Sequence, residues 1–152
     1  MPQVGIIVGS TSDQPVMEDT LKTLIDLGVE AELVAISAHR NPDKVREWVL
    51  AAEARGIEVI IAAAGGAAAL PGVVASHTTL PVIGVPLTSS DLKGVDALHS
   101  IVMMPPGIPV ATMALGAWGA RNSALFAAQV LGLKYAKIRA AVEEYRQRLR
   151  ER

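Results

Sequence analysis

The sequence predicts a single α/β domain built around a parallel β-sheet. Three apolar runs have the length and composition of buried strands, and a short motif of small or polar residues directly follows each run. The runs are VGIIV at 4–8, AELVAI at 31–36 and VIIA at 59–62. The motifs are GSTSD at 9–13, SAHR at 37–40 and AAGGAA at 63–68. Helical patterns come next, and this recurring order of strand, loop and helix is typical of βαβ units.

Length and composition agree with one domain spanning 1–152. A chain of 152 residues is long enough for one buried core and too short for two ordinary domains. Its residues are 51% hydrophobic but only 3% aromatic, so small and branched side chains dominate the core. The sequence has no cysteine, no N-terminal signal-peptide pattern and no unbroken apolar run of membrane-spanning length. We therefore expect a cytoplasmic protein without a membrane partner.

The first half predicts two helices with one buried face each. The first covers 14–27 and ends at Gly28, and the second begins at Pro42 after the N-cap residue Asn41 and ends at Gly56. Apolar residues recur at helical spacing in both. They are Met17, Leu21, Leu24 and Ile25 in the first helix, and Val45, Trp48, Val49 and Ala52 in the second.

The second half continues the pattern less regularly. We expect a short helix over 68–76, a strand over 81–85, a helix over 91–99, a short strand over 100–105 and a long helix over 110–131. The segment MMPPGIPV holds three prolines in eight residues and is predicted to be a rigid loop. The long helix is apolar on more than one side, which in so small a domain predicts self-association.

The C-terminal segment 134–152 is basic and is predicted to be an amphipathic helix. It holds seven of the 14 Lys and Arg residues against three Glu, and its apolar face consists of Ile138, Ala141, Val142, Tyr145 and Leu149. We expect this face to pack on the domain or between subunits. A nucleic-acid-binding tail is the alternative. The net charge of −1, however, gives the chain no general attraction to nucleic acid or anionic lipid.

The three motifs are expected to meet at one edge of the sheet. Parallel strands all end on the same edge, so the loops that follow them lie together there. Hydroxyls, a carboxylate, an imidazole, a guanidinium and bare backbone amides would then share one crevice. Such a set suits a phosphorylated small molecule that is handled by one acid/base group.

The GSTSD motif predicts an anion site at a helix start. Hydroxyls of Ser10, Thr11 and Ser12, with main-chain amides of the first turn, are able to bind a phosphate, and Asp13 is able to bind a sugar diol. Alternatively, Ser12 and Asp13 only cap the helix. The motif is neither a Walker A loop nor a GxGxxG fingerprint.

The SAHR and AAGGAA motifs supply the remaining chemistry. Arg40 is able to fork two N–H donors onto a phosphate, with Ser37 adding another, and His39 gives and takes a proton near neutral pH. The alternative for His39 is a structural bond to a loop carbonyl. Gly65 and Gly66 allow close approach to backbone amides, or alternatively close packing of helix on strand. The other histidines lack metal-ligand spacing, so no metal is assigned.

Five segments taken together resemble the PurE family of purine biosynthesis. They are, in order, GSTSD, SAHRNPD, AAGGAAALPG, LPVIGVP and MPPGIPV. The resemblance extends over residues 4–132 and implies a flavodoxin-like three-layer α/β/α sandwich that assembles as a homo-octamer. It also implies the activity of a 5-(carboxyamino)imidazole ribonucleotide mutase, which moves a carboxylate from an exocyclic nitrogen to the neighbouring ring carbon. Such enzymes use no cofactor, and an ATP-dependent synthase supplies their substrate.

The resemblance assigns roles to individual residues. It implies that His39 is the acid/base group, that Asp13 binds the ribose hydroxyls and that Arg40 binds substrate. Its further substrate-binding positions are Ser10, Ser12 and Ser37, of which the last two contact phosphate, and Gly65, Gly66 and Ala67 at the reacting end.

Two positions depart from the family pattern. Ala69 stands where many relatives have histidine, and Pro106 where an arginine is common. Two other functions are considered beside the mutase. One is an aminoimidazole ribonucleotide carboxylase that uses free carbon dioxide, and the other is a flavin- or nucleotide-binding module without catalysis.

Overall fold

The computed structural model describes all residues from Met1 to Arg152 and contains one parallel sheet. The sheet order is β2-β1-β3-β4-β5, and each strand pairs in parallel with its neighbours. The strands are β1 (Val4–Val8), β2 (Ala31–Ala35), β3 (Val59–Ala64), β4 (Val82–Pro86) and β5 (Ala111–Thr112). This is the strand order of flavodoxin-like doubly wound folds, so the predicted parallel sheet is confirmed.

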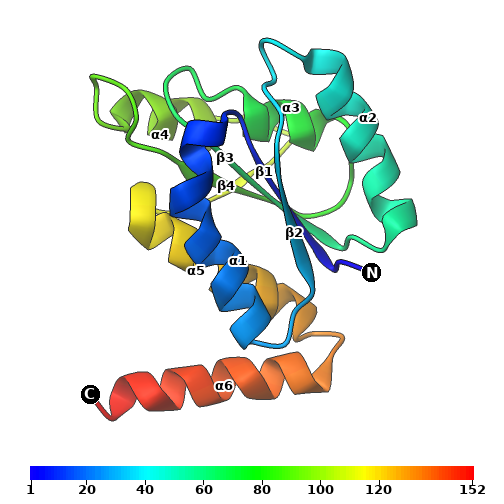
Figure 1. Cartoon of the computed structure of the whole chain (residues 1–152), viewed down its shortest axis with the longest axis vertical. Helices are drawn as coiled ribbons and strands as arrows, with labels where there is room; N and C mark the ends of the chain where they lie inside the picture. The colour runs from blue at the N-terminus through cyan, green and yellow to red at the C-terminus, as the bar shows by residue number, and fades with distance from the viewer.

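Helices cover both faces of the sheet and complete the three predicted layers (Figure 1). One face carries α1 (Gln14–Asp26) and α5 (Gly116–Leu131), and the other carries α2 (Pro42–Ala52), α3 (Leu70–Ser76) and α4 (Val95–Val102). Two short 3₁₀ turns, Thr11–Asp13 and Glu53–Arg55, adjoin α1 and α2. No helix has both the length and the apolar character needed to cross a membrane.

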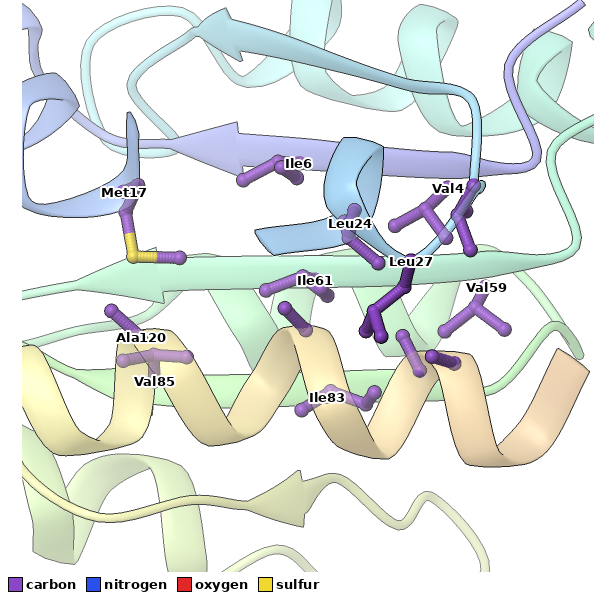
Figure 2. Close-up of a cluster of buried hydrophobic side chains, with 14 of the residues drawn as sticks. Val4, Ile6, Met17, Leu24, Leu27, Val59, Ile61, Ile83, Val85 and Ala120 are labelled. Atoms are coloured by element: carbon purple, nitrogen blue, oxygen red, sulfur yellow. The ribbon is translucent and has the colours of Figure 1, made fainter. Parts of the chain in front are cut away.

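The central strands are buried on both faces. Ile6 and Ile61 point to the α1 and α5 side, where Figure 2 shows them with Met17 and Leu24, whereas Ile7 belongs to the core on the opposite face. All of β1 and β3 is buried. This is why both strands are continuous apolar runs in the sequence rather than alternating patterns.

Two elements of the second half differ from the prediction. The expected strand over 100–105 is wrong, because helix α4 extends to Val102 and the residues after it form the proline-rich loop. Ile101 and Val102 have the β-branched side chains typical of strands. Ala97 and Ile101 nevertheless lie four residues apart and are both fully buried, so the helical periodicity determines the structure here.

The long helix begins later than predicted. Residues 111–112 form β5, which pairs with Ile83 and Gly84 of β4, and α5 starts only at Gly116. Gly84 makes this close packing possible, because a Cβ atom there would lie 2.5 Å from Ile101 and 2.8 Å from Val110. Residues 110–115, VATMAL, continue without a break into the apolar pattern of the helix, so the sequence does not separate this edge strand from it.

The C-terminal helix α6 (Ala136–Arg150) packs on α5 of its own chain. Ile138 and Val142 are buried against α5, and the helix start is held by Glu58, which accepts hydrogen bonds from Lys134 Nζ at 3.0 Å and from Tyr135 Oη at 2.5 Å. Two residues of the apolar faces expected for α1 and α6 are exposed instead. Ile25 on α1 is 58% exposed and Leu149 on α6 is 45% exposed.

A polar clamp joins α1 to α5. The Arg121 guanidinium donates two hydrogen bonds of 2.8 Å to the Asp19 carboxylate, and the buried Thr20 hydroxyl donates to the Ala120 carbonyl at 2.7 Å. The hydrogen bond from Arg121 holds the pKa of Asp19 below its usual value. The clamp fixes the helix whose first turn borders the sheet edge.

We predict that Asp19→Asn destabilises the fold at neutral pH by about 0.5 kcal/mol, because this exposed pair contributes modestly. Asp19 has a lowered pKa in the folded state. Its contribution is therefore complete above the unfolded pKa of about 4 and is lost as the pH falls through the lower folded pKa. Urea unfolding of the wild type and of Asp19→Asn should show a difference in unfolding free energy that becomes smaller below pH 4. Glu18→Gln, on the exposed side of α1, is the control, and a gap that widens in acid contradicts the prediction.

Candidate active site

A cavity of about 230 Å³ lies at the carboxyl edge of the sheet, where the loops after the first four strands meet. It brings together eight of the nine site residues expected from the sequence. These are Ser10, Ser12, Asp13, Ser37, His39, Arg40, Gly65 and Ala67. Gly66 does not line the cavity, although its two neighbours do.

Ser10, Ser12 and Asp13 of the GSTSD loop line the cavity, whereas Thr11, whose hydroxyl was also expected to bind phosphate, does not. Ser10 is extended and caps the 3₁₀ turn, with its Oγ accepting a hydrogen bond from the Ser12 amide at 3.2 Å. The hydroxyls of Ser10 and Ser12 lie 2.9 Å apart. Asp13 makes no capping hydrogen bond, so the capping alternative is wrong for Asp13. Burial raises the pKa of the Asp13 carboxyl above its usual value.

The SAHR loop is a tight turn that holds Arg40 in place. Ser37 Oγ accepts hydrogen bonds from the Arg40 amide at 3.2 Å and from Arg40 Nε at 3.3 Å, and the Ser37 carbonyl accepts from the Asn41 amide at 2.8 Å. These bonds leave the two terminal guanidinium nitrogens free to bind an anion. His39 is exposed at the cavity wall and makes no hydrogen bond to a loop carbonyl, so its structural alternative is wrong.

The two glycines of the AAGGAA loop serve different purposes. Gly66 has a φ of +63°, a conformation that favours glycine. Gly65 is needed for space, because a Cβ atom there would lie 2.1 Å from the Ser89 hydroxyl. The loop is fixed from α4, where the Ser100 hydroxyl donates to the carbonyls of Ala67 at 2.5 Å and Ala68 at 3.3 Å.

Ser89 is a polar lining residue that was not predicted from the sequence. It lies in the loop after β4, which begins with a hydrogen bond of 3.0 Å from the Leu87 amide to the Ala64 carbonyl. The sequence did carry a signal, since the hydroxyl run TSS at 88–90 follows a predicted strand just as GSTSD does. The rule that places loops at one sheet edge applies equally to this fourth loop.

The cavity wall divides into a charged half and an uncharged half. The charged half comes from the loops after β1 and β2 and carries the carboxylate, imidazole and guanidinium. The uncharged half comes from the loops after β3 and β4. It consists of Ala64, Gly65, Ala67, Ala68, Ala69, Leu70 and Ser89. Nowhere in the chain are three or more His, Asp or Glu side chains grouped so that they could hold a metal ion.

Comparison with known proteins identifies the family of the chain. The family model described as AIR carboxylase matches residues 3–152. The chain belongs to the AIR carboxylase family.

Relatives within this family cover nearly the whole chain. The N5-carboxyaminoimidazole ribonucleotide mutase of Thermotoga maritima is 54% identical over 150 residues, which are 99% of this chain and 86% of the relative. The enzyme of the same name from Pyrococcus abyssi is 55% identical over 147 residues, 97% of this chain and 83% of the relative. Among solved structures, PurE of Treponema denticola superposes with a TM-score of 0.87 at 28% identity, covering 99% of this chain and 93% of that protein.

We predict that the two glycines of this AIR carboxylase-family loop respond differently to alanine. Gly66→Ala forces an L-residue into a left-handed backbone and should cost about 1 kcal/mol of unfolding free energy. Gly65→Ala should cost less, because the colliding atom is the end of the Ser89 side chain, which is free to rotate away. Denaturant unfolding of both variants shows which one loses more unfolding free energy. A greater loss for Gly65→Ala contradicts the prediction.

Proposed function

We propose that this protein is an N5-carboxyaminoimidazole ribonucleotide mutase, an isomerase of de novo purine biosynthesis. The observation that carries the proposal is the identity of 54% and 55% with enzymes of that name over nearly the whole chain. The cavity supports it independently, because it combines anion donors, one acid/base group and an uncharged wall.

The charged half of the cavity suits the ribose phosphate of this substrate. Arg40 offers its free guanidinium nitrogens to the phosphate, and the hydroxyls of Ser12 and Ser37 add donors beside it. Asp13 accepts hydrogen bonds from the ribose hydroxyls, and Ser10 contacts the same part of the nucleotide. The imidazole end then extends toward the Gly65–Ala67 loop, whose backbone amides face the reacting carboxylate.

His39 serves both proton transfers in our proposal. It first donates a proton to the exocyclic nitrogen as the carbamate C–N bond breaks, and carbon dioxide leaves without the bonding electron pair. The ring carbon, nucleophilic like an enamine, then attacks the carbon dioxide. Neutral His39 removes the proton from that ring carbon, which restores aromaticity and returns the imidazole to its starting state. One group thus completes the cycle with no net gain or loss of protons.

The uncharged half of the cavity suits the stage of the reaction at which carbon dioxide is free. Carbon dioxide has no charge and no strong hydrogen-bonding group. A wall of Gly and Ala residues therefore offers it van der Waals contact and no polar side chain that would hold water in its place. Ala69 adds only a methyl group to this wall. His39, on the opposite half of the cavity, therefore carries out both proton transfers.

The proposed function is tested by two parallel turnover assays. One contains the carbamate nucleotide generated in place, and the other contains aminoimidazole ribonucleotide with bicarbonate. The proposal predicts fast formation of carboxylated product in the first and slow formation at modest bicarbonate in the second. Product in the second assay alone identifies a carboxylase that uses free carbon dioxide, and no product in either supports a binding module.

We predict that His39→Asn lowers kcat at least 100-fold, in the range expected for loss of a general acid/base. Nucleotide affinity should change little, because the phosphate and ribose contacts come from other residues. His77→Asn, which changes a histidine outside the cavity, is the control. A His39→Asn variant that keeps its turnover removes His39 from the mechanism.

We further propose that the enzyme assembles as a homo-octamer. Large apolar side chains are exposed around α4 and α5, including Met103 at 79% and Trp118 at 80%. The cavity of about 230 Å³ is smaller than most small-molecule sites, which hold about 300–1,000 Å³. A neighbouring copy that completes its wall accounts for both observations. We also propose that the enzyme works in the cytoplasm, downstream of an ATP-dependent synthase that makes the labile carbamate.

We predict that Trp118→Asp breaks the assembly into smaller species, because a charge replaces an exposed indole at the proposed contact. Light scattering coupled to gel filtration measures the mass directly. Leu50→Asp, at a residue of α2 that is 54% exposed, is the matched control and should leave the mass unchanged. An unaltered mass in Trp118→Asp places the contact elsewhere, and a monomeric wild-type protein overturns the octamer.

A further inference from the structure

The uncharged half of the cavity carries a single polar side chain, that of Ser89. Every other polar or charged side chain of the cavity lies on the charged half. A ligand that fills both halves therefore meets only one side-chain hydrogen-bond donor in the uncharged half of the cavity. This isolation makes Ser89 the residue best placed to distinguish ligands that differ only at that end.

The loop after β4 is built so that Ser89 is presented to the cavity. The neighbouring Ser90 is used internally, since its hydroxyl donates to Asp96 at 2.7 Å and accepts from the Leu92 amide at 3.2 Å. The bond from Ser90 also lowers the pKa of Asp96, which keeps this carboxylate ionised as an acceptor. Ser89 takes no part in these bonds, so its hydroxyl is available to a ligand.

The Ser89 hydroxyl stands directly beside Gly65. A Cβ atom on residue 65 would lie only 2.1 Å from Ser89 Oγ, so the hydroxyl occupies the space that a side chain there would take. Because Gly65 has no side chain, the Ser89 hydroxyl of the loop after β4 is able to lie next to the backbone of the loop after β3. Together they form a donor group at the uncharged end of the site.

We propose that the Ser89 hydroxyl donates a hydrogen bond to the carboxylate that the enzyme transfers. This inference rests on the proposed mutase function. The charged half takes the phosphate and ribose, so the carboxylated end of the imidazole reaches Ser89 and Gly65. A carboxylate there accepts from the Ser89 O–H, and Ser89 keeps its own proton throughout the reaction.

The same contact favours recapture of carbon dioxide over its escape. Negative charge returns to the oxygens as the ring carbon forms its bond to carbon dioxide, and a hydrogen bond to a charged acceptor is stronger than one to a neutral acceptor. Ser89 therefore stabilises the carboxylate as it forms more than it stabilises the free gas. Loss of this donor should release more substrate as aminoimidazole ribonucleotide and carbon dioxide.

The first test compares the affinities of two ligands that differ only in the carboxylate. Ser89→Ala is placed in the His39→Asn background to prevent turnover, and binding of 4-carboxy-5-aminoimidazole ribonucleotide and of aminoimidazole ribonucleotide is measured by calorimetry. The proposal predicts about a tenfold loss of affinity for the carboxylated nucleotide and no change for the other. Equal changes for both ligands, or none, overturn it. Ser76→Ala, at an exposed residue at the end of α3, controls for serine loss elsewhere.

The second test measures coupling during turnover with His39 intact. Ser89→Ala should raise the fraction of carbamate substrate released as aminoimidazole ribonucleotide several-fold above wild type, after subtraction of spontaneous decay. Ser89→Thr, which retains a hydroxyl, should restore coupling. Gly65→Ala should also uncouple the reaction by displacing Ser89, and the double variant Gly65→Ala/Ser89→Ala should be no worse than the more uncoupled single variant.

The outcomes separate this inference from the proposed function. An active wild-type enzyme whose coupling is unchanged by Ser89→Ala refutes the role of Ser89 and leaves the mutase intact. A wild-type protein that is inactive on the carbamate nucleotide refutes the mutase itself. Denaturant unfolding of Ser89→Ala shows whether the variant is folded, and the binding test remains informative for any folded variant.

Discussion

All five strands of the sheet run in the same direction, and this determines where the polar side chains of the site lie. The central strands are buried on both faces, so they carry no polar chemistry. The loops at their carboxyl ends must supply it, and parallel pairing gathers four of those loops into one cavity. The Asp19–Arg121 clamp and the buried seam between α1 and α5 hold the first of these loops from outside the site.

The sequence predicted those parts of the fold that depend on local patterns. β1, the two early helices and the sheet edge as a meeting place were evident from apolar runs followed by polar motifs. The strand expected at 100–105 and the late start of α5 show where local patterns are insufficient. Ile101 has the β-branched side chain of a strand residue, yet it lies in a helix and packs into the space that Gly84 leaves on β4. Such a tertiary contact has no signature in either segment alone.

The candidate site was predicted in the same way and with the same limit. Most expected residues line the cavity because each directly follows a strand. Gly66 was expected to line it, but its role is to turn the backbone. Ser89 was not predicted, although the hydroxyls of 88–90 follow a strand as those of GSTSD do. Ser89 lies beside Gly65 only in the folded structure, because the two residues belong to loops that are far apart in the sequence.

We propose that a cavity with one charged and one uncharged half allows a single imidazole to carry out both proton transfers. In our proposal the charged half anchors the nucleotide, and the uncharged half retains carbon dioxide until the ring carbon takes it up. Isotope transfer from substrate to product measures this retention of carbon dioxide. Substrate carrying ¹³C in its carbamate is converted in unlabelled bicarbonate, and the product is analysed by mass spectrometry. If carbon dioxide is retained, the product carboxylate keeps nearly all of the label. A product with the isotopic composition of the solution contradicts it.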